Sequence, residues 1–415
     1  VPFALRAVTS IAALVLLCGA CTPLKPGTDR LDAADAADAQ DIVAPDAPVG
    51  RCGDVAARPR VMESNITSSV TWTCDKVHQL TGVVFVNAGA TLTIEPGTLI
   101  TGSTRTALVV ERGATIIANG TALEPIVFTS GRPVGMRARA DWGGVVLLGS
   151  APVNNNTVPP AAPGDGGADA SADVVASDTG LTAGEGRIEG LPTTDDRARF
   201  GGSDPMHNCG TLRYVRIEFA GFEFAPSREL NGLTLGGCGR RTVINHVQVH
   251  MGSDDGIELF GGTVDMRNVL ITRAADDGLD WDNGYRGRIQ FLIVQQDSDP
   301  LNANNAFEGD NSELAPSWDA QPRSQPTIYN ATLVGSGAPA AMGDRDPELG
   351  MLIRRGSHVV VRNSVLINFP AGAINLANAQ TTAGAMTNDL TVENSVFYNI
   401  GPDGQTYFAA ESSPG

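Results

Sequence analysis

The feature that most constrains the fold is a repeat with a period of 22 to 24 residues. The acidic segment 254–257 returns 22 residues later as 276–279, and the segment 89–91 returns 24 residues later as 113–115. Sequence periods of this size are typical of chains that wind into stacked coils. Within residues 82–130 apolar and polar residues alternate, which indicates short strands with one buried face. The repeat therefore predicts an all-β solenoid, the parallel β-helix, with about three short strands in each coil.

The composition agrees with many short strands joined by turns. The chain has 415 residues, with 48 glycines, 25 prolines and only 5% aromatic residues, which disfavours helical bundles. Its net charge of −17 argues against a nucleic-acid partner, because phosphates attract lysine and arginine. An acidic balance of this size fits an extracellular protein or a calcium-binding protein, and we expect a monomer.

The N-terminal segment has the features of an export signal. Arg6 provides a basic region, and the apolar stretch 7–17 is too short to span a membrane. The small residues before Cys21 resemble the lipobox of bacterial lipoproteins, and this resemblance implies a signal peptide over 1–21 with Cys21 as the lipidated residue. We therefore expect an outer-membrane or cell-surface lipoprotein. The alternative is a secreted protein cleaved after alanine.

Four cysteines remain after such processing. An even number of cysteines in an exported chain indicates two disulfides, for which three pairings exist. Local pairing is the simplest arrangement, and it joins Cys52 with Cys74 and Cys209 with Cys238.

Two low-complexity segments divide the chain. Residues 22–50 are rich in Asp, Ala and Pro, so we expect a disordered tether. Residues 151–186 have a similar composition and are expected to form a loop inserted between coils, since loop closure costs little. The predicted organisation is then an N-terminal cap and the first coils over 51–150, the inserted loop, and the remaining coils over 187–415.

Several motifs resemble those of a known group of proteins. The strings GATLTIEPGT, PIVFTS and DWGG occur in this order over residues 89–144. They resemble a family of exported bacterial proteins with pectin-lyase-like repeats. The resemblance implies a right-handed parallel β-helix and export, and it implies no particular activity.

The repeated acidic segment is the main candidate site. If the coils stack, its two copies lie roughly 4.8 Å apart, and their carboxylates crowd one edge. Such a cluster requires a cation, arginine partners or raised pKa values. Calcium takes six to eight oxygen ligands, and the carboxylates that could supply them are those of Asp254, Asp255, Glu258, Asp276, Asp277, Asp280 and Asp282.

Two other interpretations of this segment remain open. Residues 252–257 resemble the paired-Asp motif of polygalacturonases, which would make Asp254, Asp255 and Asp277 catalytic carboxylates, although the other motifs of those enzymes are absent. Alternatively the carboxylates are structural, and they cap turns and pair with nearby arginines, such as Arg273 and Arg288.

Trp281 and Tyr285 lie within the same acidic stretch. Exposed aromatic rings beside carboxylates are suited to gripping sugar rings, so these two residues are the predicted ligand-binding pair. The alternative is that Trp281 packs over a turn.

A second regularity concerns asparagine. Asn245, Asn268, Asn330, Asn363 and Asn394 each precede a short apolar run. In stacked coils, asparagines at one turn position can form a hydrogen-bonded ladder, and we expect such a ladder here.

These observations predict a surface-exposed binding or scaffolding β-helix. Its acidic strip would hold calcium, its membrane contact would be the lipid anchor, and a polysaccharide is the expected ligand by analogy of fold. The alternatives are a polysaccharide hydrolase or lyase acting through the same strip, and a purely structural envelope or adhesion module.

Overall fold

The computed structural model describes residues 52–155, 181–191, 195–225, 228–299, 302–338, 348–405 and 407–408. The predicted lipidation site Cys21, the segments 1–21 and 22–50, and most of the low-complexity loop lie outside the described residues. No helix in the described ranges is long and apolar enough to cross a membrane.

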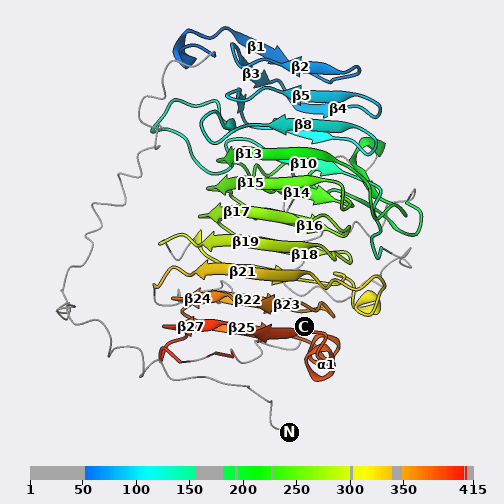
Figure 1. Cartoon of the computed structure of the whole chain (residues 1–415), viewed down its shortest axis with the longest axis vertical. Coiled ribbons are helices and arrows are strands. Elements are labelled where there is room, and N and C mark those ends of the chain that lie inside the picture. The colour runs from blue at the N-terminus through cyan, green and yellow to red at the C-terminus, as the bar shows by residue number, and fades with distance from the viewer. Residues whose placement is uncertain are drawn as a thin grey trace, which may run out of the picture. The chain divides into compact units, whose positions relative to one another are not determined.

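Parallel strands stack coil upon coil from β1 to β27 (Figure 1). The larger sheet has sixteen strands. They are β1 (Arg60–Glu63), β2 (Val70–Trp72), β3 (Val77–Leu80), β5 (Thr91–Ile94), β6 (Leu99–Gly102), β8 (Thr115–Asn119), β9 (Ile126–Ser130), β13 (Gly210–Glu218), β15 (Val243–His250), β17 (Met266–Thr272), β19 (Arg288–Gln295), β21 (Thr327–Val334), β23 (Val360–Arg362), β24 (Val365–Ile367), β26 (Thr391–Glu393) and β27 (Val396–Tyr398).

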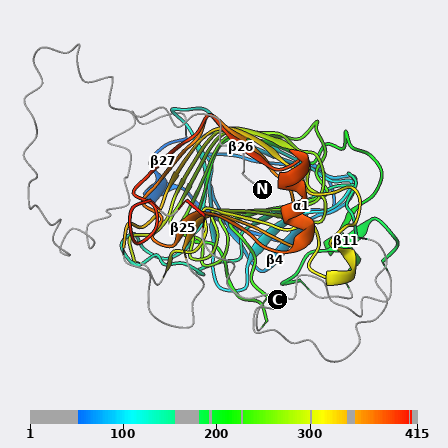
Figure 2. The ribbon, with the colours of Figure 1, turned by 90° about the horizontal axis from the view of Figure 1, so that it is seen from below.

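A nine-stranded sheet closes the remaining side of each coil (Figure 2). Its strands are β4 (Val83–Val86), β7 (Ala107–Val110), β10 (Val145–Leu148), β14 (Leu233–Gly236), β16 (Ile257–Phe260), β18 (Leu279–Asp282), β20 (Phe307–Gly309), β22 (Leu349–Ile353) and β25 (Gly372–Leu376). The helix α1 (Ala379–Thr387) lies beside the last coil, and the short 3-10 helices are η3 (Val55–Ala57), η4 (Asp196–Ala198) and η6 (Ala315–Ser317). The predicted parallel β-helix is confirmed.

The sixteen-stranded sheet bends at one column of residues. The first half of β13 pairs with β8 and its second half with β9, and Tyr214 between them has a φ of 47°. Stacked on it in register are six further residues with positive φ: His246, Asn268, Phe291, Asn330, Asn363 and Asn394. Asparagine tolerates this left-handed conformation better than most residues, which explains why it recurs at the bend.

The predicted asparagine slot is therefore correct for four positions and wrong for Asn245, whose place in the column is taken by His246. The amide of Asn268 does donate to Asn245 Oδ1 across 2.9 Å, one residue away from the bend column. The repeated asparagines thus recur because they tolerate the positive φ of the bend. An amide ladder explains their recurrence less well.

Alternation along each strand places the core between the sheets. On β18 the side chains of Leu279 and Trp281 point inward and are fully buried, whereas Asp280 is on the outer face. Gly278 has no room for a side chain, because a Cβ there would come within 2.3 Å of Val294 Cγ1. Its neighbour Gly256 is constrained in the same way by Ile271, so these glycines reflect close packing at the corner.

A small hairpin covers the first strands of the nine-stranded sheet. β11 (Glu185–Arg187) and β12 (Arg199–Gly201) are antiparallel, and Phe200 packs with Phe85, Val146 and neighbouring side chains on the outer face of that sheet. The coil resumes only at β13, later than residue 187, where the sequence places its return. Phe200 also packs against Phe260 at the end of β16, with ring centroids 5.7 Å apart, so the hairpin contacts the sheet as far as β16.

Both expected disulfides are confirmed. Cys52 is bonded to Cys74, and Cys209 to Cys238, with Cα–Cα distances of 5.1 and 5.8 Å. The first joins the N-terminal cap to the first coils, and the second ties the start of β13 to the end of β14.

Candidate functional site: an acidic strip

The two copies of the acidic segment stack in register, as the repeat predicts. Gly256 N donates to Asp277 O across 2.9 Å, and Ile257 pairs with Leu279. The carboxylates of Asp254, Asp255 and Asp276 consequently gather, with oxygen atoms within 4.8 Å of one another. We call the outer-face carboxylates on and beside β16, β18 and β20 the acidic strip.

Asp255 and Asp277 also belong to a column of structural side chains. Asn231 Oδ1 accepts a hydrogen bond from the backbone of Asp255 (3.2 Å), Asp255 Oδ1 from Asp277 N (2.9 Å), and Asp277 Oδ1 from Asn305 N (2.7 Å). Each side chain thus fastens its coil to the next. Asn305 Oδ1 in turn accepts from Leu349 N at 3.3 Å. Because two members of this column are asparagines, the bond requires a side-chain oxygen and does not require a charge.

Burial gives these two aspartates unusual protonation behaviour. Only 7% of Asp255 and 4% of Asp277 is exposed. Burial raises the pKa of Asp255 well above its ordinary value, and the neighbouring Asp254 and Asp280 carboxylates raise it further. Burial likewise raises the pKa of Asp277, with Glu308 as the next contributor. Without a cation, the coils therefore favour the neutral acids at these positions.

The second group of carboxylates lies on the strands themselves. Glu258, Asp280 and Glu308 occupy the same register position on β16, β18 and β20. The oxygens of Asp255, Glu258 and Asp280 lie within 4.8 Å of one another. Three carboxylates at this separation supply hard oxygen ligands on one side of a cation and leave the other side to water or a ligand.

Arginine closes the strip at its C-terminal side. Arg354 forms ion pairs with Glu308 and with Asp310, the latter at 3.0 Å, and Arg355 pairs with Asp310 at 2.8 Å. Burial raises the pKa of Glu308 to about 7, and Arg354 opposes the rise. The sequence indicated Glu308 and Asp310 as an extension of the strip but gave no sign of Arg354, which follows a long turn in the next coil.

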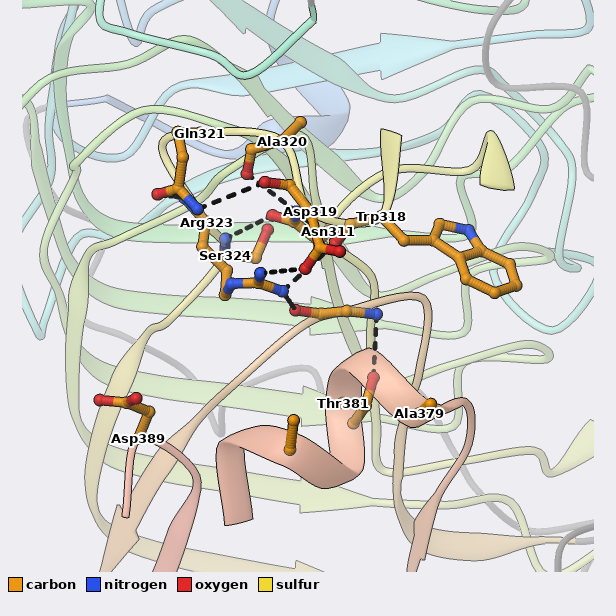
Figure 3. A network of polar contacts seen from close by, with 12 residues as sticks. Asn311, Trp318, Asp319, Ala320, Gln321, Arg323, Ser324, Ala379, Thr381 and Asp389 are labelled. Atoms are coloured by element: carbon orange, nitrogen blue, oxygen red, sulfur yellow. Dashed lines mark hydrogen bonds and ion pairs between the residues drawn. The ribbon is translucent and has the colours of Figure 1, made fainter. Parts of the chain in front are cut away.

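A polar network holds the segment that follows Asp310. Asn311 Oδ1 accepts from Ser324 N at 2.7 Å, and Asn311 Nδ2 donates to the carbonyls of Trp318 and Ala320 (Figure 3). Arg323 donates to Gly356 O, whose own N–H donates to Thr381 Oγ1 of α1 at 2.9 Å (Figure 3). These contacts fix the end of β20 against the helix, which keeps Glu308 and Arg354 in place.

Other predicted residues do not join the strip in the expected way. Asp282 is on the outer face beyond Asp280, accepts from Asn283 Nδ2 at 3.1 Å, and is in neither of the two close carboxylate groups among the described residues. Of the arginines considered as partners, Arg273 pairs with Asp297, and Arg288 pairs with Asp265. The nearby arginines thus pair with carboxylates outside the double turn.

The prediction that Trp281 and Tyr285 are exposed is wrong. Both side chains are fully buried. Trp281 Nε1 donates to Ser357 Oγ at 2.9 Å, and the Tyr285 hydroxyl donates to Val264 O at 2.9 Å. Alternation in the segment 279–282 already placed Trp281 on the same side as Leu279, so the strand period was the signal that should have decided its direction.

The geometry disfavours Asp254, Asp255 and Asp277 as an inverting catalytic set. Inverting hydrolysis needs two carboxyl groups about 6.5–9.5 Å apart, with a water between them. Asp254 and Asp255 are closer than this, and Asp255 and Asp277 are buried and engaged with the backbone. Of the carboxylates on the strands, Asp280 is half-buried, whereas Glu258 is buried and accepts from Asn231 Nδ2, and Glu308 is paired with Arg354.

Comparison with known proteins agrees with the architecture. No curated protein and no solved structure matches the chain. A model of the pectate-lyase-like β-helix domain family matches residues 64–411, which is most of the sequence. The chain therefore belongs to the family of pectate-lyase-like β-helix domains.

Proposed function

We propose that this protein is an exported binding β-helix whose acidic strip holds calcium and presents it to a carbohydrate. The observation that carries the proposal is the convergence of the Asp255, Glu258 and Asp280 carboxylates within 4.8 Å on an outer sheet face. Asp254 and Asp276 extend this set at the adjacent turn.

Calcium would offset the electrostatic free-energy cost of these crowded carboxylates. Crowded, desolvated carboxylates are unfavourable when ionised, as the raised pKa of Asp255 reflects. A divalent cation stabilises the ionised form, and its remaining coordination positions can accept hydroxyl or carboxylate oxygens of a sugar polymer.

Thermal and urea unfolding with calcium or with chelator tests the metal. A ligand that binds only the folded state stabilises it by about 2.7 kcal/mol at a hundredfold excess over the dissociation constant. We expect calcium to raise the unfolding midpoint, and we expect Asp280→Asn to weaken calcium binding at least tenfold. Glu393→Gln, at an exposed glutamate on β26, is the matched control and retains the response. An equal response in Asp280→Asn and the control contradicts the proposal.

One observation favours a second function, a polysaccharide hydrolase or lyase. Glu308 has a pKa raised to about 7 by burial and contacts Arg354, so an acid near neutrality and a cation lie side by side. Incubation of the wild-type protein, Glu308→Gln and Glu393→Gln with polyuronides distinguishes the two functions. Release of reducing or unsaturated sugars that is lost in Glu308→Gln and retained in Glu393→Gln establishes the enzyme. Binding without release supports the binding protein.

We also propose lipid attachment at Cys21, on the lipobox-like sequence before it. Labelling of cells with palmitate is expected to mark the wild-type chain and to leave Cys21→Ser unlabelled. Equal labelling of both chains contradicts the anchor.

A further inference from the structure

A groove lies on a different face from the acidic strip, on the outer side of the sixteen-stranded sheet. Its volume is about 500 Å³. Strands β8 and β13 and the turn after β8 supply its walls, and the polar or aromatic side chains lining it are Asn119, Thr121, Thr211, Arg213 and Tyr214. No part of the acidic strip contributes to this groove.

Aromatic side chains occupy the bend column beside the groove. Tyr214, His246 and Phe291 stand at positions of positive φ, whereas the other coils have asparagine there, at Asn268, Asn330, Asn363 and Asn394. A bulky residue in this conformation is uncommon. The rings of Tyr214 and His246 are stacked, with centroids 4.3 Å apart and planes at 19°.

The turn that follows β8 precedes Tyr214 in the stack. There the chain has Gly120, and a Cβ on this residue would come within 2.6 Å of the Tyr214 carbonyl oxygen. Gly120 and Thr121 line the groove together with Tyr214. Tyr214 and His246 form a stacked pair at this end of the column, and Asn268 separates them from Phe291.

Arginines form a parallel column next to these rings. Arg213, Asn245 and Arg267 are in register on β13, β15 and β17, so the two arginines lie about 10 Å apart. The Arg267 guanidinium lies 5.2 Å from the centroid of the Phe291 ring. Arg213 is exposed, and within the described ranges it forms no ion pair. In a chain with 46 acidic and 29 basic residues, two such arginines on one face are a local positive patch.

We propose that this arginine and aromatic groove binds an anionic glycan. A sugar ring stacks on Tyr214, which lines the groove, and Arg213 and Arg267 bind carboxylate or sulfate groups on successive sugars. The side chains of Asn119, Thr121 and Thr211 supply hydrogen bonds to sugar hydroxyls. The two arginines of the patch select an anionic chain over a neutral one.

The proposal is independent of calcium on the acidic strip, and the test separates the two. Binding of a labelled hyaluronate oligosaccharide, a heparin fragment and an uncharged dextran oligosaccharide is measured in the presence of chelator. We expect the wild-type protein to bind at least one of the anionic probes and not dextran, and the preferred probe identifies carboxylate or sulfate. Asp280→Asn is expected to bind as wild type does. Failure to bind either anionic probe, or equal binding of dextran, overturns the proposal.

Two variants test the residues. Tyr214→Asn places at the bend the residue that four later coils have there, so the fold is retained while the ring is lost. Arg213→Gln removes the charge, and Arg105→Gln, at an exposed arginine of a remote turn with φ of 64°, is its matched control. We expect at least tenfold weaker binding in the first two and unchanged binding in the control. Wild-type affinity in Tyr214→Asn or in Arg213→Gln overturns the assigned role.

Discussion

The stability of the calcium-free protein should fall as pH rises, and Glu308 is the residue that allows the size of the fall to be calculated. Its side chain is 13% exposed, and burial raises its pKa from 4.5 to about 7. Between these values the folded state binds more protons than the unfolded state. The stabilising contribution is therefore complete below pH 4.5 and is lost as pH rises toward 7.

The difference between 4.5 and about 7, at about 1.4 kcal/mol for each pH unit, corresponds to about 3 kcal/mol for complete titration of Glu308. Between about pH 5 and about pH 8, where the unfolded carboxyl is already partly ionised, about 2 to 3 kcal/mol remains. Asp255 and Asp277 act in the same direction, because burial raises the pKa of both.

Urea unfolding in chelator at about pH 5 and about pH 8 measures this loss. In Glu308→Gln the fall in the free energy of unfolding should be smaller by about 2 to 3 kcal/mol, since the buried charge never forms. Glu393→Gln, at an exposed position, should keep the wild-type fall. If Glu308→Gln and wild type lose the same free energy between the two pH values, the assignment of a buried, destabilised carboxylate to Glu308 is refuted.

Two further substitutions test the packing of the same coils. At about pH 8 in chelator, Asp277→Asn should stabilise the protein, because the side-chain oxygens of Asn231 and Asn305 make the same column bond without a charge, whereas Asp277→Ala should cost about 1–3 kcal/mol. The urea midpoints of the two variants test this, and the reverse order contradicts a structural role for Asp277. Trp281→Ala should cost about 3–5 kcal/mol in urea unfolding, because the ring is fully buried and its N–H bonds Ser357; a cost below about 1 kcal/mol would contradict its place in the core.

The fold was predictable because successive copies of the repeat lie only one coil apart in the sequence. The period between Asp255 and Asp277 is one coil, and the uninterrupted turn between them preserves the register. The disulfides were predictable for a similar reason, as each joins neighbouring coils. Longer turns remove this regularity. Arg354 meets Glu308 from the next coil after a long connection, so no fixed spacing in the sequence relates the two.

The side-chain directions were predictable in principle, and the aromatic pair shows where the composition of a segment misleads. Trp281 stands between two aspartates, which suggests an exposed ring. Strand alternation gives the opposite answer, and it also places Glu258 and Asp280 together on the outer face. The bend column could not be derived from asparagine alone, because His246 and Tyr214 occupy the same backbone conformation.

The side-chain directions give the carboxylates of the acidic segment two different roles. Asp255 and Asp277 lie at the corner, where their oxygens hold the next coil, so their negative charge is a cost that a cation can offset. Glu258 and Asp280 lie on the strand face, in register with each other, and Glu258 accepts a hydrogen bond from Asn231 Nδ2. A cation placed among Asp255, Glu258 and Asp280 would therefore couple ligand binding to the stability of the coil stack. Removing charge at the corner should raise stability without calcium, whereas removing it at the strand face should chiefly lower the response to calcium.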